Sequence, residues 1–173
     1  RFSGIRHVLL YIRPGDSGGW RNAYLNMKTE VQKLGNILRH TFEKNAWHGL
    51  AVMEVLNSID EQIVHKKFNS THSIIELVAH MTAWRVFVTE ELSGNINYKV
   101  SQEMNFPVVK SWQEAVDGLV ASQEKLLTQL EKFPAERLSD VVPNKPYKFF
   151  TMLHGIVHHD LYHLGQIVLI KKS

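Results

Sequence analysis

Apolar and polar residues alternate along most of the chain with the period of an α-helix. Long apolar stripes run through residues 28–45, 73–93, 111–133 and 149–170, and a shorter stripe lies at 50–59. Apolar positions that recur three and four residues apart lie on one face of a helix, so each stripe marks a face that packs on other helices. The pattern therefore predicts four long amphipathic helices, with a short extra helix after the first.

The residues that flank these stripes are typical of helix boundaries. Ser73 with Glu76, and Ser111 with Glu114, fit capping boxes, in which the serine binds a free backbone N–H and the glutamate reaches back. Gly94 follows the second long stripe and is typical of a helix end. The two Val-Val pairs in the loops indicate short extended links at most. We therefore predict an all-α fold, a four-helix bundle.

The first 26 residues differ from the rest of the chain. Gly and Pro cluster at residues 14–19, which is typical of a turn or linker. The net charge of +3 arises within this segment, from its four arginines and Asp16. We expect residues 1–26 to be an N-terminal extension, non-native or disordered, with Met27 as the natural start and residues 27–173 as the bundle domain. A genuine N-terminal arm is the alternative.

Composition narrows the classes of function. Residues 27–173 contain equal numbers of basic and acidic side chains, so the folded body lacks the basic surface that nucleic-acid binding requires. No apolar run approaches the roughly 18 residues of a membrane helix, and we expect no membrane segment. Cys is absent, so a metal site would use His, Asp and Glu. These features favour a cytoplasmic protein.

Histidines are concentrated in the last long stripe. His154 and His158 lie four residues apart, as do His159 and His163, so each pair stacks on one helix face with the spacing of a metal chelator. The apolar face of this helix extends toward the second pair, which we therefore favour. On the second long helix His80 lies at the edge of the apolar stripe, where it can meet the second pair across the bundle.

The segment H-D-x-x-H at residues 159–163 is one methylene away from a zinc-protease motif. A zinc protease takes a third ligand from later in the chain, and no His, Asp or Glu follows His163. A di-iron bundle needs two Glu-x-x-His motifs, which Asp160 and His163 match only approximately. Both classes are disfavoured. Three imidazoles with an open position remain, a strongly Lewis-acidic set that suits zinc or nickel, with iron or cobalt as alternatives.

Three segments carry a family resemblance. SIIELVAHMTAW at 73–84 resembles the second helix of the DinB/YfiT-like superfamily, with His80 at a ligand position. HGIVHHDLYHLGQI at 154–167 resembles the last helix of that family, in which H-x-x-x-H is followed shortly by Gly-Gln. The tripeptide at 47–49 is similar to a turn after the first helix of the family. The resemblance covers about residues 27–171.

This resemblance implies a four-helix bundle that binds one divalent metal ion through His80, His159 and His163, and it implies frequent homodimers. Characterised relatives include transferases and isomerases that use low-molecular-weight thiols. The leading hypothesis is therefore a thiol-dependent S-transferase, in which the metal holds the thiol as thiolate for attack on an electrophile. One alternative is a hydrolase with a metal-activated water. Others are a metal-binding stress protein without turnover, its fourth metal position closed by His48 or His154, and a bundle that binds no metal.

Four further residues are candidates for the site. Trp47, Trp84 and Tyr162 could wall a pocket for a small-molecule substrate or thiol, although aromatic residues at helical spacing more often belong to a core. Asp160 could orient a ligand imidazole or face solvent.

Overall fold

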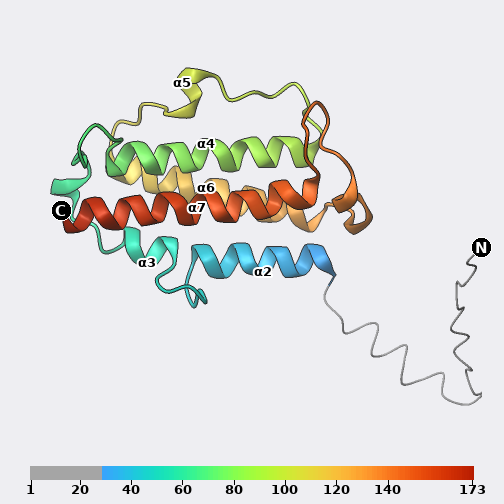
Figure 1. Cartoon of the computed structure of the whole chain (residues 1–173), viewed down its shortest axis with the longest axis horizontal. Helices are drawn as coiled ribbons and strands as arrows, with labels where there is room; N and C mark the ends of the chain where they lie inside the picture. Colours follow the sequence, from blue (N-terminus) through green and yellow to red (C-terminus); the bar gives the residue numbers. More distant parts are fainter. Residues whose placement is uncertain (1–28) are drawn as a thin grey trace, which may run out of the picture.

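The computed structural model describes residues 29–173, which form an all-α bundle (Figure 1). The four long helices are α2 (Glu30–Phe42), α4 (Ile74–Ser93), α6 (Trp112–Glu131) and α7 (Phe149–Lys172). They confirm the predicted fold class. In the part of the chain that the structure describes, no helix is both long and apolar enough to span a membrane. The predicted extension over residues 1–26 and the proposed start at Met27 lie outside the described residues.

The observed helices differ from the apolar pattern mainly at their ends. The first long helix ends at Phe42 rather than near residue 45, where Asn45 takes a left-handed backbone conformation with a φ of 62°. The short extra helix is α3 (Val52–Leu56). Nothing in the sequence predicts α5 (Gln102–Asn105), because its 4 residues are too few to show a period.

The two predicted capping sites begin α4 and α6. At α4 the Glu76 carboxylate accepts hydrogen bonds from the backbone N–H and the hydroxyl of Ser73, at 2.6 and 2.8 Å. At α6 the Ser111 hydroxyl accepts from the Glu114 N–H at 3.1 Å, whereas the Glu114 carboxylate reaches past Ser111 to the N–H of Lys110. Because backbone donors at a helix start have no partner within the helix, these bonds fix where both helices begin.

Helices α4 and α7 lie side by side in the bundle, although they are far apart in the sequence (Figure 1). Helix α4 also packs on α6, and α2 packs on both α6 and α7. The connection from α4 to α6 carries α5 and returns along the outer side of α4 (Figure 1). The histidine-bearing segments of α4 and α7 are therefore neighbours, with the α5 connection beside them.

The predicted apolar faces are buried in two groups, one toward each end of the bundle. Leu34, Val88 and Leu130 belong to the first group, and Met81 and Ile167 belong to the second. Each fully buried side chain of this size contributes about 1.5–3 kcal/mol of transfer free energy. The two groups together supply the main driving force for the packing of the four long helices.

A hydrogen-bonded network joins all four long helices between the two apolar groups. Arg85, in the middle of α4, is fully buried. Its guanidinium donates to both carboxylate oxygens of Asp160 on α7, at 2.9 and 2.7 Å, and to the side-chain oxygen of Gln123 on α6, at 3.1 Å. Gln123 donates to the backbone carbonyl of Leu38 on α2 at 3.2 Å. The buried charges are thus paired, as a low-dielectric interior requires.

This network corrects the expectation for Asp160. The side chain neither orients an imidazole nor faces solvent, because it is buried and both of its oxygens are bound to Arg85. Burial raises the pKa of Asp160, and the charge of Arg85 opposes that rise. The sequence gives no sign of the pair, since the two residues lie 75 positions apart and Arg85 interrupts an apolar stripe.

Candidate metal centre

Three histidines from two helices meet between α4 and α7. His80 comes from α4, and His159 and His163 lie one turn apart on α7. One ring nitrogen of each histidine lies within 4.8 Å of the corresponding nitrogens of the other two. The Nε2 atoms of His80 and His159 are 3.0 Å apart. The structure therefore brings together the three residues that the sequence singled out, and we refer to them as the histidine triad.

The three imidazoles are neutral at pH 7. Burial is the largest cause that lowers the pKa of His159 to about 3, followed by the repulsion that a proton on His163 or His80 and the charge of Arg85 would exert on a second positive charge. Burial also lowers the pKa of His80 and that of His163 below their usual range. A neutral imidazole keeps a lone pair on one nitrogen, which is the form that binds metal ions.

The α5 connection decides which nitrogen of His80 carries the proton. The Nδ1 atom lies 2.7 Å from the backbone carbonyl oxygen of Asn105, and because a carbonyl oxygen only accepts, Nδ1–H must donate. The lone pair is then on Nε2, which faces His159. Phe106 stacks on the His80 ring with 4.3 Å between centroids, and the Trp84 indole N–H donates to the Asn105 side chain at 3.0 Å. These contacts hold the ring in one orientation.

His163 has a comparable partner on its own helix. Its Nδ1 atom lies 2.6 Å from the side-chain oxygen of Gln166, so Nδ1–H donates and the lone pair is on Nε2. His159 differs, since its Nδ1 is buried and has no hydrogen-bond partner among the described residues. Two of the three imidazoles are thus fixed with Nε2 free.

This donor set fits a tetrahedral divalent ion. Imidazole nitrogens that bind zinc at about 2.0–2.1 Å lie roughly 3.3 Å from each other, and the Nε2 atoms of His80 and His159 are 3.0 Å apart. The hydrogen bonds from Nδ1 of His80 and His163 to Asn105 and Gln166 are those that metal-binding histidines usually make. The three residues could therefore hold a metal ion.

Within residues 29–173, no fourth His, Asp or Glu joins the triad. His48 is exposed in the loop after α2, and Nδ1 of His154 donates to the backbone carbonyl of Phe150 at 3.0 Å. The alternative in which His48 or His154 closes a fourth metal position is therefore wrong for this structure. His158 is exposed as well. A metal in the triad would keep a position for water or a ligand.

The three aromatic residues that were candidates for a pocket wall lie in different places. The ring centroid of Trp84 is 5.8 Å from that of His159, and the ring of Tyr162 is 5.1 Å from His163. Trp47 is fully exposed and lines none of the cavities described below. The loop after α2 lies on the far side of α7 from α4 (Figure 1).

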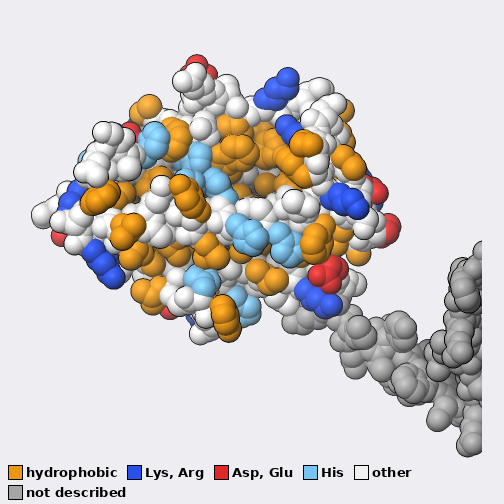
Figure 2. All heavy atoms as spheres, viewed as in Figure 1, with side chains coloured by type: hydrophobic (Ala, Val, Ile, Leu, Met, Phe, Trp, Pro, Cys, Tyr) orange, Lys and Arg blue, Asp and Glu red, His pale blue; other side chains and the backbone are white. Residues whose placement is uncertain are grey.

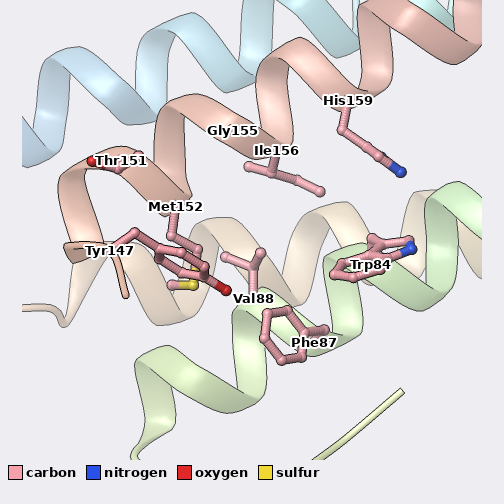
Figure 3. A pocket seen from close by; sticks show the side chains of 9 residues that line it. All are labelled: Trp84, Phe87, Val88, Tyr147, Thr151, Met152, Gly155, Ile156 and His159. Atoms are coloured by element: carbon pink, nitrogen blue, oxygen red, sulfur yellow. The ribbon is translucent and has the colours of Figure 1, made fainter. Parts of the chain in front are cut away.

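A cavity of about 290 Å³ opens beside His159, and we refer to it as the His159 cavity. Its walls come from α4, α7 and the end of the loop before α7, and consist of Trp84, Phe87, Val88, Tyr147, Thr151, Met152, Gly155, Ile156 and His159. Figure 3 shows His159 and Trp84 at one end and Tyr147 and Thr151 at the other. On this face of the molecule, histidine side chains lie next to a patch of hydrophobic side chains (Figure 2).

A second cavity of about 390 Å³ adjoins the other side of the triad, and we refer to it as the His163 cavity. Its walls come from the loop before α4, the start of α4 and the last turns of α7, and consist of Phe68, Thr71, His72, Leu77, Tyr162, His163, Gln166, Leu169 and Ile170. No residue lines both cavities. The triad therefore has a separate hollow on each side.

Asn105 and Phe106 are contacts of the triad that sequence reasoning misses. Both lie in the α5 connection, and only the path of that loop over α4 brings them to His80. Gln166 belongs to the motif that carries the family resemblance, but the motif gave it no role. Its position three residues after His163 is the signal that could have assigned it, because such residues are neighbours on a helix.

The chain is therefore a bundle of four long helices with a histidine triad that could bind a metal ion. A family model of the DinB superfamily matches residues 44–167, which is most of the chain. The chain belongs to the DinB superfamily, as the resemblance of its second and last long helices implies. No curated protein and no solved structure matches the chain.

Proposed function

We propose that this protein is a divalent-metal-dependent enzyme that transfers a low-molecular-weight thiol to an electrophile. The observation that carries the proposal is the convergence of three neutral imidazoles with no fourth protein ligand among residues 29–173. A divalent ion bound there supplies a Lewis acid that lowers the pKa of a thiol or water at its open position. Imidazole ligands favour zinc or nickel.

In this proposal the residues around the triad have distinct tasks. His80, His159 and His163 hold the ion through ring nitrogens. The Asn105 carbonyl and the Gln166 side chain accept from the Nδ1–H groups of His80 and His163, which keeps Nε2 free and the rings oriented. The partly buried position of the triad limits access of water, so that charges on the reactants interact more strongly.

The two cavities favour transfer over hydrolysis. A transferase must hold two organic reactants at once, whereas a hydrolase needs room for one substrate and a water. The His159 cavity and the His163 cavity lie on different sides of the triad and share no lining residue. This arrangement offers one hollow for the thiol and one for the electrophile, each next to a triad histidine.

The first test is metal content by elemental mass spectrometry on untagged full-length protein. We expect about one equivalent of zinc or nickel in the wild type and none in His159→Ala/His163→Ala. The matched control is His154→Ala/His158→Ala, which removes an i, i+4 pair from the same helix and should keep the metal. A wild type that stays metal-free after reconstitution would overturn the proposal.

The second test separates transfer from hydrolysis on the metal-loaded protein. A panel of low-molecular-weight thiols is offered with an aryl halide, and the adduct is followed by mass spectrometry. We expect adduct formation above the background rate only with thiol and loaded wild-type protein together. Turnover of ester or amide substrates without any thiol would instead support a hydrolase with metal-activated water.

A further inference from the structure

The His159 cavity has the composition of a site for an uncharged group. Its nine lining residues include no Lys, Arg, Asp or Glu, and the rings of Trp84, Phe87 and Tyr147 form much of its wall. The hydroxyl groups of Tyr147 and Thr151 are its polar groups away from His159. A charged ligand group would lose its hydration here without gaining a partner of opposite charge, whereas an apolar group would gain from leaving water.

The size of this cavity restricts the ligand to a small molecule. An apolar protein cavity of about 150 Å³ is already large enough for benzene. The His159 cavity measures about 290 Å³, so it has room for an aromatic ring with a short substituent. A whole helix or a folded peptide segment does not fit within this volume.

The orientation of the ligand follows from the two ends of the cavity. His159 and Trp84 stand at one end, and Tyr147 and Thr151 stand at the other (Figure 3). His159 is the lining residue that also belongs to the histidine triad. A ligand whose reactive group lies at the triad therefore extends its remaining atoms along Phe87 and Ile156 toward Tyr147.

We propose that the His159 cavity is the subsite for the apolar part of the electrophilic substrate, an uncharged aryl or short alkyl group joined to a reactive polar end at the triad. This assignment rests on the proposed metal-dependent function for the reactive end only. The affinity of the cavity for an apolar group depends on its own walls and remains if the triad binds no metal.

Gly155 allows the cavity to be filled without disturbing the core. It lies on α7 in the cavity wall, and a Cβ atom added there meets no atom within 4 Å. The variant Gly155→Leu should therefore fold and should occupy the cavity. The matched control is Gly165→Leu, at a position on α7 that also has no atom within 4 Å of an added Cβ and that lines neither cavity. Metal content of both variants is measured first.

The experiment compares two probes by calorimetry on the metal-loaded full chain. Acetohydroxamate carries only a metal-binding head, and benzohydroxamate adds a phenyl group to the same head. We expect benzohydroxamate to bind wild type and Gly165→Leu at least about tenfold more tightly than acetohydroxamate, the gain from burying a ring. The gain should disappear in Gly155→Leu. Equal affinities of the two probes in wild type, or a gain that survives in Gly155→Leu, would overturn the assignment.

A third probe separates failure of the subsite from failure of the proposed function. Fluorobenzene has no metal-binding group, and its binding to metal-free protein is followed by fluorine NMR. Binding of fluorobenzene to wild type but not to Gly155→Leu, with no binding of acetohydroxamate, would reject the metal site and support the cavity as an apolar subsite. The opposite outcome is that both hydroxamates bind, fluorobenzene does not bind, and the phenyl group of benzohydroxamate adds no affinity that Gly155→Leu removes. That outcome would reject the subsite and leave the metal site intact.

Discussion

The three imidazoles of the triad differ in the hydrogen-bond partner of their Nδ1 atoms. His80 and His163 each donate from Nδ1 to an oxygen acceptor, whereas Nδ1 of His159 is buried without a partner in the described part of the chain. The first two rings are therefore held with Nε2 free before any ion arrives. The position of His159 depends instead on packing beside Trp84 and on its contact with His80.

Gln166→Leu should weaken metal binding while leaving all three imidazoles in place. Loss of the acceptor for Nδ1–H of His163 frees the ring to rotate and lowers its basicity, which costs about 10- to 100-fold in metal affinity. The exposed Gln62→Leu is the control and should bind metal as the wild type does. Competition with a zinc-binding dye measures both, and equal affinity in the two variants would contradict a positioning role for Gln166.

Glu91 should make the folded protein less stable as the pH rises. Its carboxylate is buried without a hydrogen bond, and burial raises its pKa above 4.5, with partial compensation from Lys145 at 4.0 Å. Between 4.5 and the raised pKa the folded chain binds more protons than the unfolded chain, so the free energy of unfolding falls as pH increases.

The variant Glu91→Gln tests this because it removes the titrating group. We measure urea denaturation from pH 4 to 8, a range that begins below the ordinary pKa of a glutamate. We expect the stability of Glu91→Gln relative to the wild type to increase as pH rises. Glu124→Gln, at an exposed site, should show a difference from wild type that stays constant with pH. A constant difference for Glu91→Gln as well would show that Glu91 is already ionised throughout this range.

At the scale of elements, the triad and the α5 connection link segments that the sequence separates. The triad joins α4 to α7, and Phe106 stacks between His72 and His80, with centroid distances of 3.6 and 4.3 Å. The Asn105 carbonyl adds a hydrogen bond to His80. An ion in the triad would therefore hold α4 and α7 together. It would also favour the position of the α5 connection in which Phe106 and the Asn105 carbonyl contact His80.

Removal of the metal should lower the melting temperature. A ligand that binds only the folded state at 100 times its dissociation constant stabilises by about 2.7 kcal/mol, which corresponds to roughly 5–10 °C for a chain of this size. Calorimetry of zinc-loaded and chelator-treated protein measures the shift. His80→Ala should show none, and His154→Ala/His158→Ala should show the full wild-type shift. A shift that persists in His80→Ala would mean that zinc binds elsewhere.

At the scale of the whole molecule, the Arg85 network is the contact shared by all four long helices. Replacement of Arg85 by Met, or of Asp160 by Leu, leaves a buried charge without its partner and should cost about 3–5 kcal/mol of stability. The double variant removes both charges and should be more stable than either single variant. Urea denaturation of the four proteins completes the cycle, and additive losses would contradict a coupled pair.

The family resemblance implies a homodimer, and this stays a prediction. Light scattering would test it by measuring the molar mass of the protein in solution.

The pattern of apolar and polar residues was enough to predict the long helices and the faces that they bury. Helix formation and amphipathic patterning depend on residues three or four apart, so the stripes through α4, α6 and α7 could be recognised without knowledge of their neighbours. The same local rule paired His159 with His163, and the position of His80 at the edge of its stripe marked it as a partner. The family resemblance reinforced this choice of residues.

The folded bundle, and not the local pattern, shows which of these faces meet and what surrounds the histidines. The pairing of Asp160 with Arg85, the carbonyl of Asn105 behind His80 and the exposure of Trp47 all depend on the order of helices in the bundle and on the path of its loops. Such contacts join residues tens of positions apart. No local spacing encodes them, because they form only when the apolar faces pack and bring distant segments together.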